Sequence, residues 1–235
     1  NQRWEPIEHM PVARQGHAMT GGSLPGTVVA LGGCADNSCH PYLTSASRYA
    51  PGAANNWTQL PDMTTPRKSL AAATVNGTVF ALGGTSGGGG FLASVEAFDL
   101  AAGAHWTLLA ASMTTPRLSH AAAVLLGVIY VAGGFDGNLN TLASVERFDG
   151  GAHNAWAPVP ASMTTARHGF ALIALEEGGA GVPPGGLLVA AGGQTNIVFA
   201  SAEAFGPAAP NAAWAAIASL ATARSGCAGA ALHGK

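Results

Sequence analysis

The strongest constraint on this chain is a pattern of residues that recurs about once every fifty positions. Each copy contains a tryptophan, an arginine ten or eleven positions later, a glycine pair, and an aromatic residue shortly before the next tryptophan. The tryptophans are Trp4, Trp57, Trp106, Trp156 and Trp214, and the arginines are Arg14, Arg67, Arg117, Arg167 and Arg224. The glycine pairs are Gly32-Gly33, Gly83-Gly84, Gly133-Gly134 and Gly192-Gly193. Four anchors that keep one order predict a repeat fold in which each copy is one structural unit.

Each unit has the pattern of four short strands. In the second unit we expect strands at 71–75, 79–82 and 94–98, followed by a fourth strand that carries Trp106 and Leu108. Asn76-Gly77 between the first two strands suits a type I′ turn, because both central residues of that turn need positive φ. We expect the glycine pairs to allow close approach of backbone or rings, and the tryptophans to pack in the core. Glycine and turn residues interrupt every alanine-rich run, so we expect no long helix.

The repeats also predict the boundaries of the units. We expect an all-β, partial propeller of four complete blades over residues 12–63, 64–113, 114–163 and 164–221. Residues 1–11 would form the last strand of a preceding blade, with the strand itself at 4–10. Residues 222–235 would form the first strand of a further blade, at 224–233. These incomplete units suggest a segment of a longer chain with eighteen strands in this part.

Composition argues against several classes of partner. The formal net charge is −2 and only 9% of residues are charged, so the chain offers no basic field for nucleic acid. The apolar run 121–135 is shorter than the roughly 20 residues that a membrane-spanning helix needs and is interrupted by Gly127 and the Gly133-Gly134 pair, and no secretion signal opens the sequence. Three cysteines are too few for a disulfide scaffold and favour a cytoplasmic location. We therefore expect no nucleic acid and no membrane among its partners.

Two segments resemble kelch repeats. They read MTTPRKSLAAATVNGTVFALGG with ASVEAF and Trp106, and MTTPRLSHAAAVLLGVIYVAGGFDG with ASVERF and Trp156. The resemblance extends over essentially the whole chain and implies a β-propeller in which each unit is one four-stranded blade. The chain departs from the family pattern at Ser47, where the third strand of the other units has glutamate, and at Val29 and Val189, where Phe80 and Tyr130 are aromatic.

The arginines are the main candidates for a binding site. In kelch proteins, arginines at this position can form a pocket for acidic peptides, which here would comprise Arg14, Arg67, Arg117, Arg167 and Arg224 at the mouth of the central channel. We include in this pocket the neighbouring residues Ser69, Ser119, His120 and His168. The alternative is that each arginine binds carbonyl groups of the preceding turn and joins neighbouring blades, since one residue in every repeat suggests a repeated structural task.

Other chemistry-bearing residues give weaker patterns. His17, His120 and His168 follow their arginines at different spacings, which favours polar residues inside the channel over a catalytic cluster. Cys34, Cys39 and His40 share a loop but supply only three of the four ligands that zinc prefers, so we expect a disulfide or two free thiols. We predict no catalytic residue, no metal and no cofactor.

The resemblance implies a protein–protein interaction module that presents the loops 34–44, 85–92, 135–142 and 194–200 to a partner protein. The pattern is most similar to the propellers of kelch-like substrate adaptors for cullin ubiquitin ligases. The alternative is a small kelch enzyme that acts on sugars, either oxidase-like or mutarotase-like. The recurrence of Glu96, Glu146 and Glu203 in the third strands favours a structural role for these carboxylates over a catalytic one.

Overall fold

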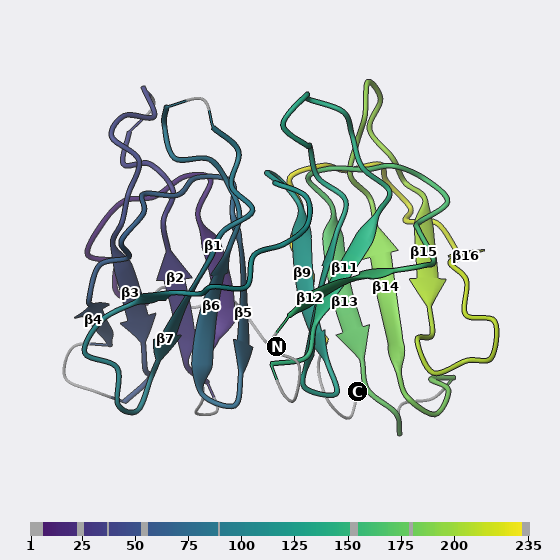
Figure 1. The fold of residues 1–235 in the computed structure, drawn as a ribbon, viewed down its shortest axis with the longest axis horizontal. Coiled ribbons are helices and arrows are strands. Elements are labelled where there is room, and N and C mark those ends of the chain that lie inside the picture. Colours follow the sequence, from purple (N-terminus) through teal and green to yellow (C-terminus); the bar gives the residue numbers. More distant parts are fainter. Residues whose placement is uncertain are drawn as a thin grey trace.

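Four antiparallel sheets of four strands each make up the protein (Figure 1). A computed structural model describes residues 7–22, 26–36, 38–52, 56–88, 90–150, 155–178 and 181–231. No described residue belongs to a helix, so this part of the chain holds no helix able to cross a membrane. The predicted all-β propeller architecture is confirmed.

The strands follow the order of the sequence within each blade. Blade 1 contains β1 (Ala18–Gly21), β2 (Val28–Leu31), β3 (Ala46–Tyr49) and β4 (Trp57–Leu60). Blade 2 contains β5 (Ala71–Val75), β6 (Thr78–Leu82), β7 (Val95–Asp99) and β8 (Thr107–Leu108). Blade 3 contains β9 (Ala121–Leu125), β10 (Val128–Ala132), β11 (Val145–Phe148) and β12 (Trp156–Val159). Blade 4 contains β13 (Ala171–Leu175), β14 (Leu187–Ala191), β15 (Ala202–Phe205) and β16 (Ala215–Ile217).

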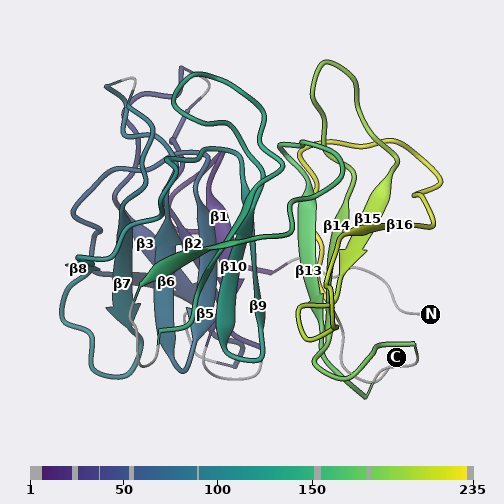
Figure 2. The same ribbon diagram turned by 45° about the vertical axis from the view of Figure 1, so that its right-hand side comes forward.

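The first strands of the blades pack against one another in the order β1, β5, β9, β13 (Figure 2). They surround a central channel of about 810 Å³ that residues 228–231 also line. Its wall consists mainly of small side chains, among them Ala72, Ala73, Ala122 and Ala123. Small residues let the four strands converge, while the larger side chains pack between the sheets.

Tight turns connect the first two strands of blades 2 and 3, and the first of these turns was predicted. Asn76 and Gly77 have φ values of 48° and 80°, as a type I′ turn requires. Leu126 and Gly127 adopt the same conformation, with φ values of 51° and 77°. Leu126 is 59% exposed, so its side chain gains little from packing in this position.

The cores between the sheets repeat one aromatic pair per blade. The last aromatic residue of the third strand contacts the tryptophan of the same unit, with ring centroids 5.3 Å apart in all four blades. The pairs are Tyr49–Trp57, Phe98–Trp106, Phe148–Trp156 and Phe205–Trp214. Burial of such rings contributes about 2–3 kcal/mol each, and the pairs therefore anchor the blade interiors.

The two flanking strands expected at the ends of the sequence are not found among the described residues. Residues 7–10 and 222–231 form no strand, and Trp4 and His233 lie outside the described residues. In each blade the first strand pairs with the second strand, whereas residues 222–231 pair with no strand among the described residues. Without a neighbouring strand the backbone has no ladder of hydrogen bonds, so sixteen strands are described where eighteen were expected.

Candidate functional site

Three of the predicted binding arginines are buried inside the blades. Arg67, Arg117 and Arg167 have no exposed surface, and each guanidinium group forms an ion pair with a glutamate of the third strand. The pairs are Arg67–Glu96 at 3.1 Å, Arg117–Glu146 at 3.0 Å and Arg167–Glu203 at 2.7 Å. The anion-accepting pocket predicted from these arginines is therefore wrong, because their donors are already bound and out of reach of a ligand.

Each of these arginines joins two blades. The guanidinium group of Arg117 donates to the carbonyl groups of Gly133 and Ser144 in its own blade. Its backbone carbonyl accepts a hydrogen bond from Gly84 N–H of the preceding blade at 2.8 Å. Arg67 and Arg167 repeat this arrangement with Gly33 and Gly134. These contacts agree with the alternative interpretation, in which each arginine binds carbonyl groups and joins neighbouring blades.

The glutamates complete these junctions. The carboxylate of Glu96 accepts hydrogen bonds from the backbone N–H groups of Thr64 and Thr65 as well as from Arg67. Burial alone would raise the pKa of Glu96, but the hydrogen bonds from Thr64 and the charge of Arg67 outweigh it and hold the pKa below 4.5. The carboxylate of Glu203 has the same surroundings and a pKa lowered for the same reasons. These carboxylates are therefore structural anions, as their recurrence suggested.

The remaining two arginines lack this partner. Arg14 donates to the carbonyl groups of Gly32 and Ser45, but position 47, where the other blades have glutamate, holds a serine. Burial lowers the pKa of Arg14 despite the charge of Asp62. Arg224 is exposed, and its backbone binds blade 4 through Gly193 and Phe199. None of the ion pairs within the described residues includes its side chain.

The predicted serines belong to a continuous inter-blade hydrogen-bond series. One residue of each unit, two positions after the arginine, donates its N–H to the carbonyl of the equivalent residue in the unit before. The series comprises Gly16, Ser69, Ser119, Gly169 and Gly226, with N–O distances of 2.7–2.9 Å. All five residues have positive φ, between 52° and 62°. Ser69 and Ser119 therefore hold neighbouring blades together through their backbone.

The glycine pairs permit the close contact between blades. A Cβ atom on Gly83 would lie 2.7 Å from the carbonyl oxygen of Arg117, and the first glycine of each other pair approaches the next arginine in the same way. Both glycines of every pair also have positive φ. Larger residues would clash with backbone that is already fixed by hydrogen bonds.

The histidines occupy separate environments. His120 is buried next to Gly83 and Gly134, and neither of its ring nitrogens has a hydrogen-bond partner among the described residues. Burial, with a smaller effect from Arg117, lowers its pKa to about 3. The His168 ring contacts Phe135 in a tilted arrangement with ring centroids 4.1 Å apart, and burial lowers the pKa of His168. His17 lies half-buried near Arg14, and these residues form no joint catalytic group.

The four loops that connect second and third strands lie together at the top of the molecule (Figure 1). We call the residues 34–44, 85–92, 135–142 and 194–200, with the exception of those not described, the loop face. Cys34 and Cys39 form a disulfide bond in its first loop, which removes both thiolates as metal ligands. The Lys68 ammonium lies 5.8 Å from the centre of the Tyr42 ring, and Phe135 packs on His168. Residues from neighbouring blades thus support the loops.

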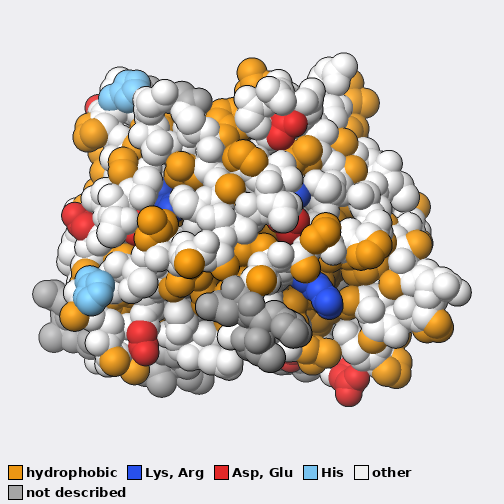
Figure 3. Space-filling view, viewed as in Figure 1, with side chains coloured by type: hydrophobic (Ala, Val, Ile, Leu, Met, Phe, Trp, Pro, Cys, Tyr) orange, Lys and Arg blue, Asp and Glu red, His pale blue; other side chains and the backbone are white. Residues whose placement is uncertain are grey.

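The loop face exposes large apolar side chains, which the sequence analysis did not single out. Leu139 and Ile197 are each 67% exposed and Val198 is 44% exposed, on adjacent loops of blades 3 and 4. Charged side chains are few and scattered on the side of the molecule drawn in Figure 3. The signal available in the sequence was the presence of leucine, isoleucine and valine next to asparagine and threonine in these loops.

Comparison with known proteins agrees with the repeat geometry. A family model described as the kelch motif matches residues 66–110 and again residues 116–160. Two segments of the chain therefore carry the kelch motif. Both matches begin next to a buried arginine and end after the tryptophan of the same blade, so they cover blades 2 and 3.

A solved structure titled "Structure of YjhT" has the same architecture. It superposes with a TM-score of 0.73 and 16% identity, over 92% of this chain and 68% of that chain. This likeness shows the fold. No curated protein matches the chain.

Proposed function

We propose that this kelch propeller binds a partner protein through its loop face. The kelch propeller fold is in general a protein-interaction module. The observation that carries the proposal is the pair of exposed apolar loop tips, Leu139 and Ile197, on adjacent blades. Isolated exposed apolar residues are common, but three on neighbouring loops of a rigid frame are a suitable centre for a protein interface.

The chemistry of the partner follows from this face. The apolar tips would be buried against apolar side chains, while Asp36 and Asp136 place carboxylates on other parts of the loop face and Lys68 lies beside its first loop. An acidic peptide is a less suitable partner, because three of the five guanidinium groups predicted to bind it are buried in ion pairs. A role as substrate receptor for a ubiquitin ligase remains a prediction from the resemblance alone.

A peptide-display selection on the immobilised protein tests the proposal. Peptides selected on the wild type should contain apolar residues and should lose at least about tenfold in affinity for the double variant L139D/I197D. L126D is the matched control, because Leu126 is comparably exposed but lies on the first hairpin of blade 3. Peptides that bind L139D/I197D and the wild type equally would contradict a site on the loop face. Turnover of sugars by the purified protein would favour the enzyme alternative instead.

A further inference from the structure

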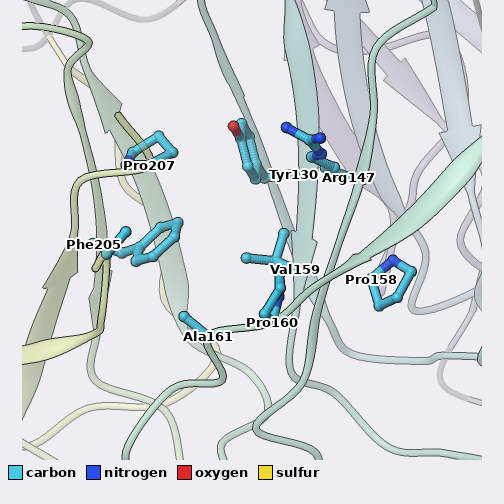
Figure 4. Close-up of a pocket in the computed structure, with 9 residues that line it drawn as sticks. Tyr130, Arg147, Pro158, Val159, Pro160, Ala161, Phe205 and Pro207 are labelled. Atoms are coloured by element: carbon cyan, nitrogen blue, oxygen red, sulfur yellow. The ribbon is translucent and has the colours of Figure 1, made fainter. Parts of the chain in front are cut away.

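A second cavity lies between blades 3 and 4, outside the loop face. It has a volume of about 320 Å³. Figure 4 shows Tyr130 and Arg147 together on one side, Phe205 and Pro207 on the opposite side, and Val159, Pro160 and Ala161 below them. None of these residues belongs to the four loops, so the cavity is independent of the proposed protein-binding site.

The equivalent space between blades 2 and 3 is filled. There Phe80 takes the place of Tyr130, and its ring meets the edge of Phe148 with centroids 5.9 Å apart. No such ring contact joins Tyr130 and Phe205 among the described residues. Tyr130 instead shares a hydrogen bond with Arg147, its cross-strand neighbour on β11. The cavity beside Tyr130 thus lies where, in the preceding junction, the rings of Phe80 and Phe148 are in contact.

The cavity contains one cation without a counter-charge. None of the three ion pairs within the described residues includes Arg147, whose side chain is exposed. At the equivalent place in blade 2 the chain has Ala97, which leaves no charge there. The rest of the lining is apolar, with three prolines and the Phe205 ring presenting rigid surfaces. The cavity therefore has a polar side, formed by Tyr130 and Arg147, and an apolar side, formed by Phe205 and Pro207.

We propose that this cavity binds a small aromatic carboxylate. Its ring lies against Phe205 and Pro207, and its carboxylate accepts hydrogen bonds from the Arg147 guanidinium and the Tyr130 hydroxyl. An arginine fork matches a carboxylate in geometry and charge, whereas the apolar walls match a ring. The volume is at the lower end of ligand sites, which selects a compound with one ring over an oligosaccharide or a peptide.

Isothermal titration calorimetry with phenylacetate on the full chain tests this proposal. We expect saturable binding of phenylacetate, and binding at least about tenfold weaker for acetate and for 2-phenylethanol, since each lacks one half of the recognised chemistry. R147A should weaken phenylacetate about tenfold or more, and Y130F should weaken it less. Arg48 occupies the place of Arg147 in blade 1, so R48A is the matched control and should leave binding unchanged.

Two further results decide the outcome. A161L should fill the cavity and abolish binding while the melting temperature stays close to that of the wild type. Absence of saturable phenylacetate binding, or equal losses in R147A and R48A, would overturn the proposal. Equal affinity for phenylacetate and 2-phenylethanol would likewise overturn the role of Arg147. All of these measurements are independent of the loop face, so failure here leaves the proposed protein partner untouched.

Discussion

At the scale of single residues, buried charge dominates the behaviour of this protein. Three arginines and three glutamates are removed from water in pairs, and the backbone carbonyl of each of these arginines accepts a hydrogen bond from the preceding blade. Removing one member of such a pair leaves the other charge buried and uncompensated. Substitution of these three arginines is therefore expected to change the stability of the protein first.

R117A should lower the free energy of unfolding by about 3–5 kcal/mol, because Glu146 would remain buried without its counter-charge. R224A is the matched control, since this arginine is exposed and its described contacts are made by the backbone; its effect should stay below about 0.5 kcal/mol. Urea unfolding followed by tryptophan fluorescence measures both. Similar losses for the two variants would show that the ion pair is not the source of the stability.

His120 should make stability depend on pH in mildly acidic solution. Its pKa falls from 6.5 to about 3 on folding, so the unfolded chain binds the proton more readily. The stabilisation is complete above pH 6.5 and is lost as the pH falls from there toward 3, by at most about 1.4 kcal/mol per pH unit. Unfolding midpoints measured between pH 7 and pH 4.5 give the slope.

H120L provides the control for this pH dependence. Leucine occupies the equivalent place in blade 2, at Leu70, and is buried there, so the substitution should fit. The variant should show a flatter profile between pH 6.5 and 4.5 than the wild type. A slope that persists unchanged in H120L would assign the effect to other groups.

The residue scale is also where the sequence predicted least. It identified the arginines, glutamates and glycines by their recurrence, but recurrence does not tell whether a charge faces solvent or a partner. Arg67 and Glu96 lie 29 residues apart, as do Arg117 and Glu146, and this equal separation in two units was the available evidence for pairing; in blade 4 the separation is 36. The aromatic cavity between blades 3 and 4 arises from small differences between equivalent positions, which become visible only when blades are placed side by side.

At the scale of elements, the strands and turns were largely predictable. The first strand of blade 2 spans Ala71–Val75 as expected, because alternation and the Asn76-Gly77 turn define it locally. The expected strands at the two ends failed because a strand depends on a neighbour as well as on its own residues. Local pattern thus fixes an element only where its partner strand is present.

L126N should stabilise the first hairpin of blade 3. Leu126 has a φ of 51° and is 59% exposed, whereas asparagine tolerates this conformation and stands at the equivalent position in blade 2. We expect a gain of about 0.5–1 kcal/mol in the free energy of unfolding. Chemical denaturation of L126N beside the reverse variant N76L measures it. A gain for N76L would contradict the explanation, since that variant introduces the strain.

At the scale of the whole molecule, the blades are similar in outline but unequal in their internal bonding. Blades 2, 3 and 4 each contain a buried ion pair, whereas blade 1 has Ser47 in place of the glutamate and leaves Arg14 without a carboxylate partner. The loops of the loop face are connected to these blades, so their positions depend on how firmly each blade is held.

Blade 1 should consequently open more readily than the others. Native-state hydrogen exchange should show lower protection for backbone amides of β2 and β3 than for those of β6 and β7 in blade 2. S47E should raise the protection of blade 1, because a glutamate there can pair with Arg14 as Glu96 pairs with Arg67. Equal protection in the two blades of the wild type would contradict this ranking.

The inter-blade hydrogen-bond series has a consequence for how such a molecule can change over time. Every junction uses the same backbone atoms, so the contact between one blade and the next does not depend on the side chains that distinguish them. A duplicated unit would therefore find a matching surface on either neighbour without any new contact being selected. Evolution can therefore lengthen the chain by whole blades while the loops of each copy diverge independently. The backbone contacts between blades are kept, and new binding specificities arise in the loops.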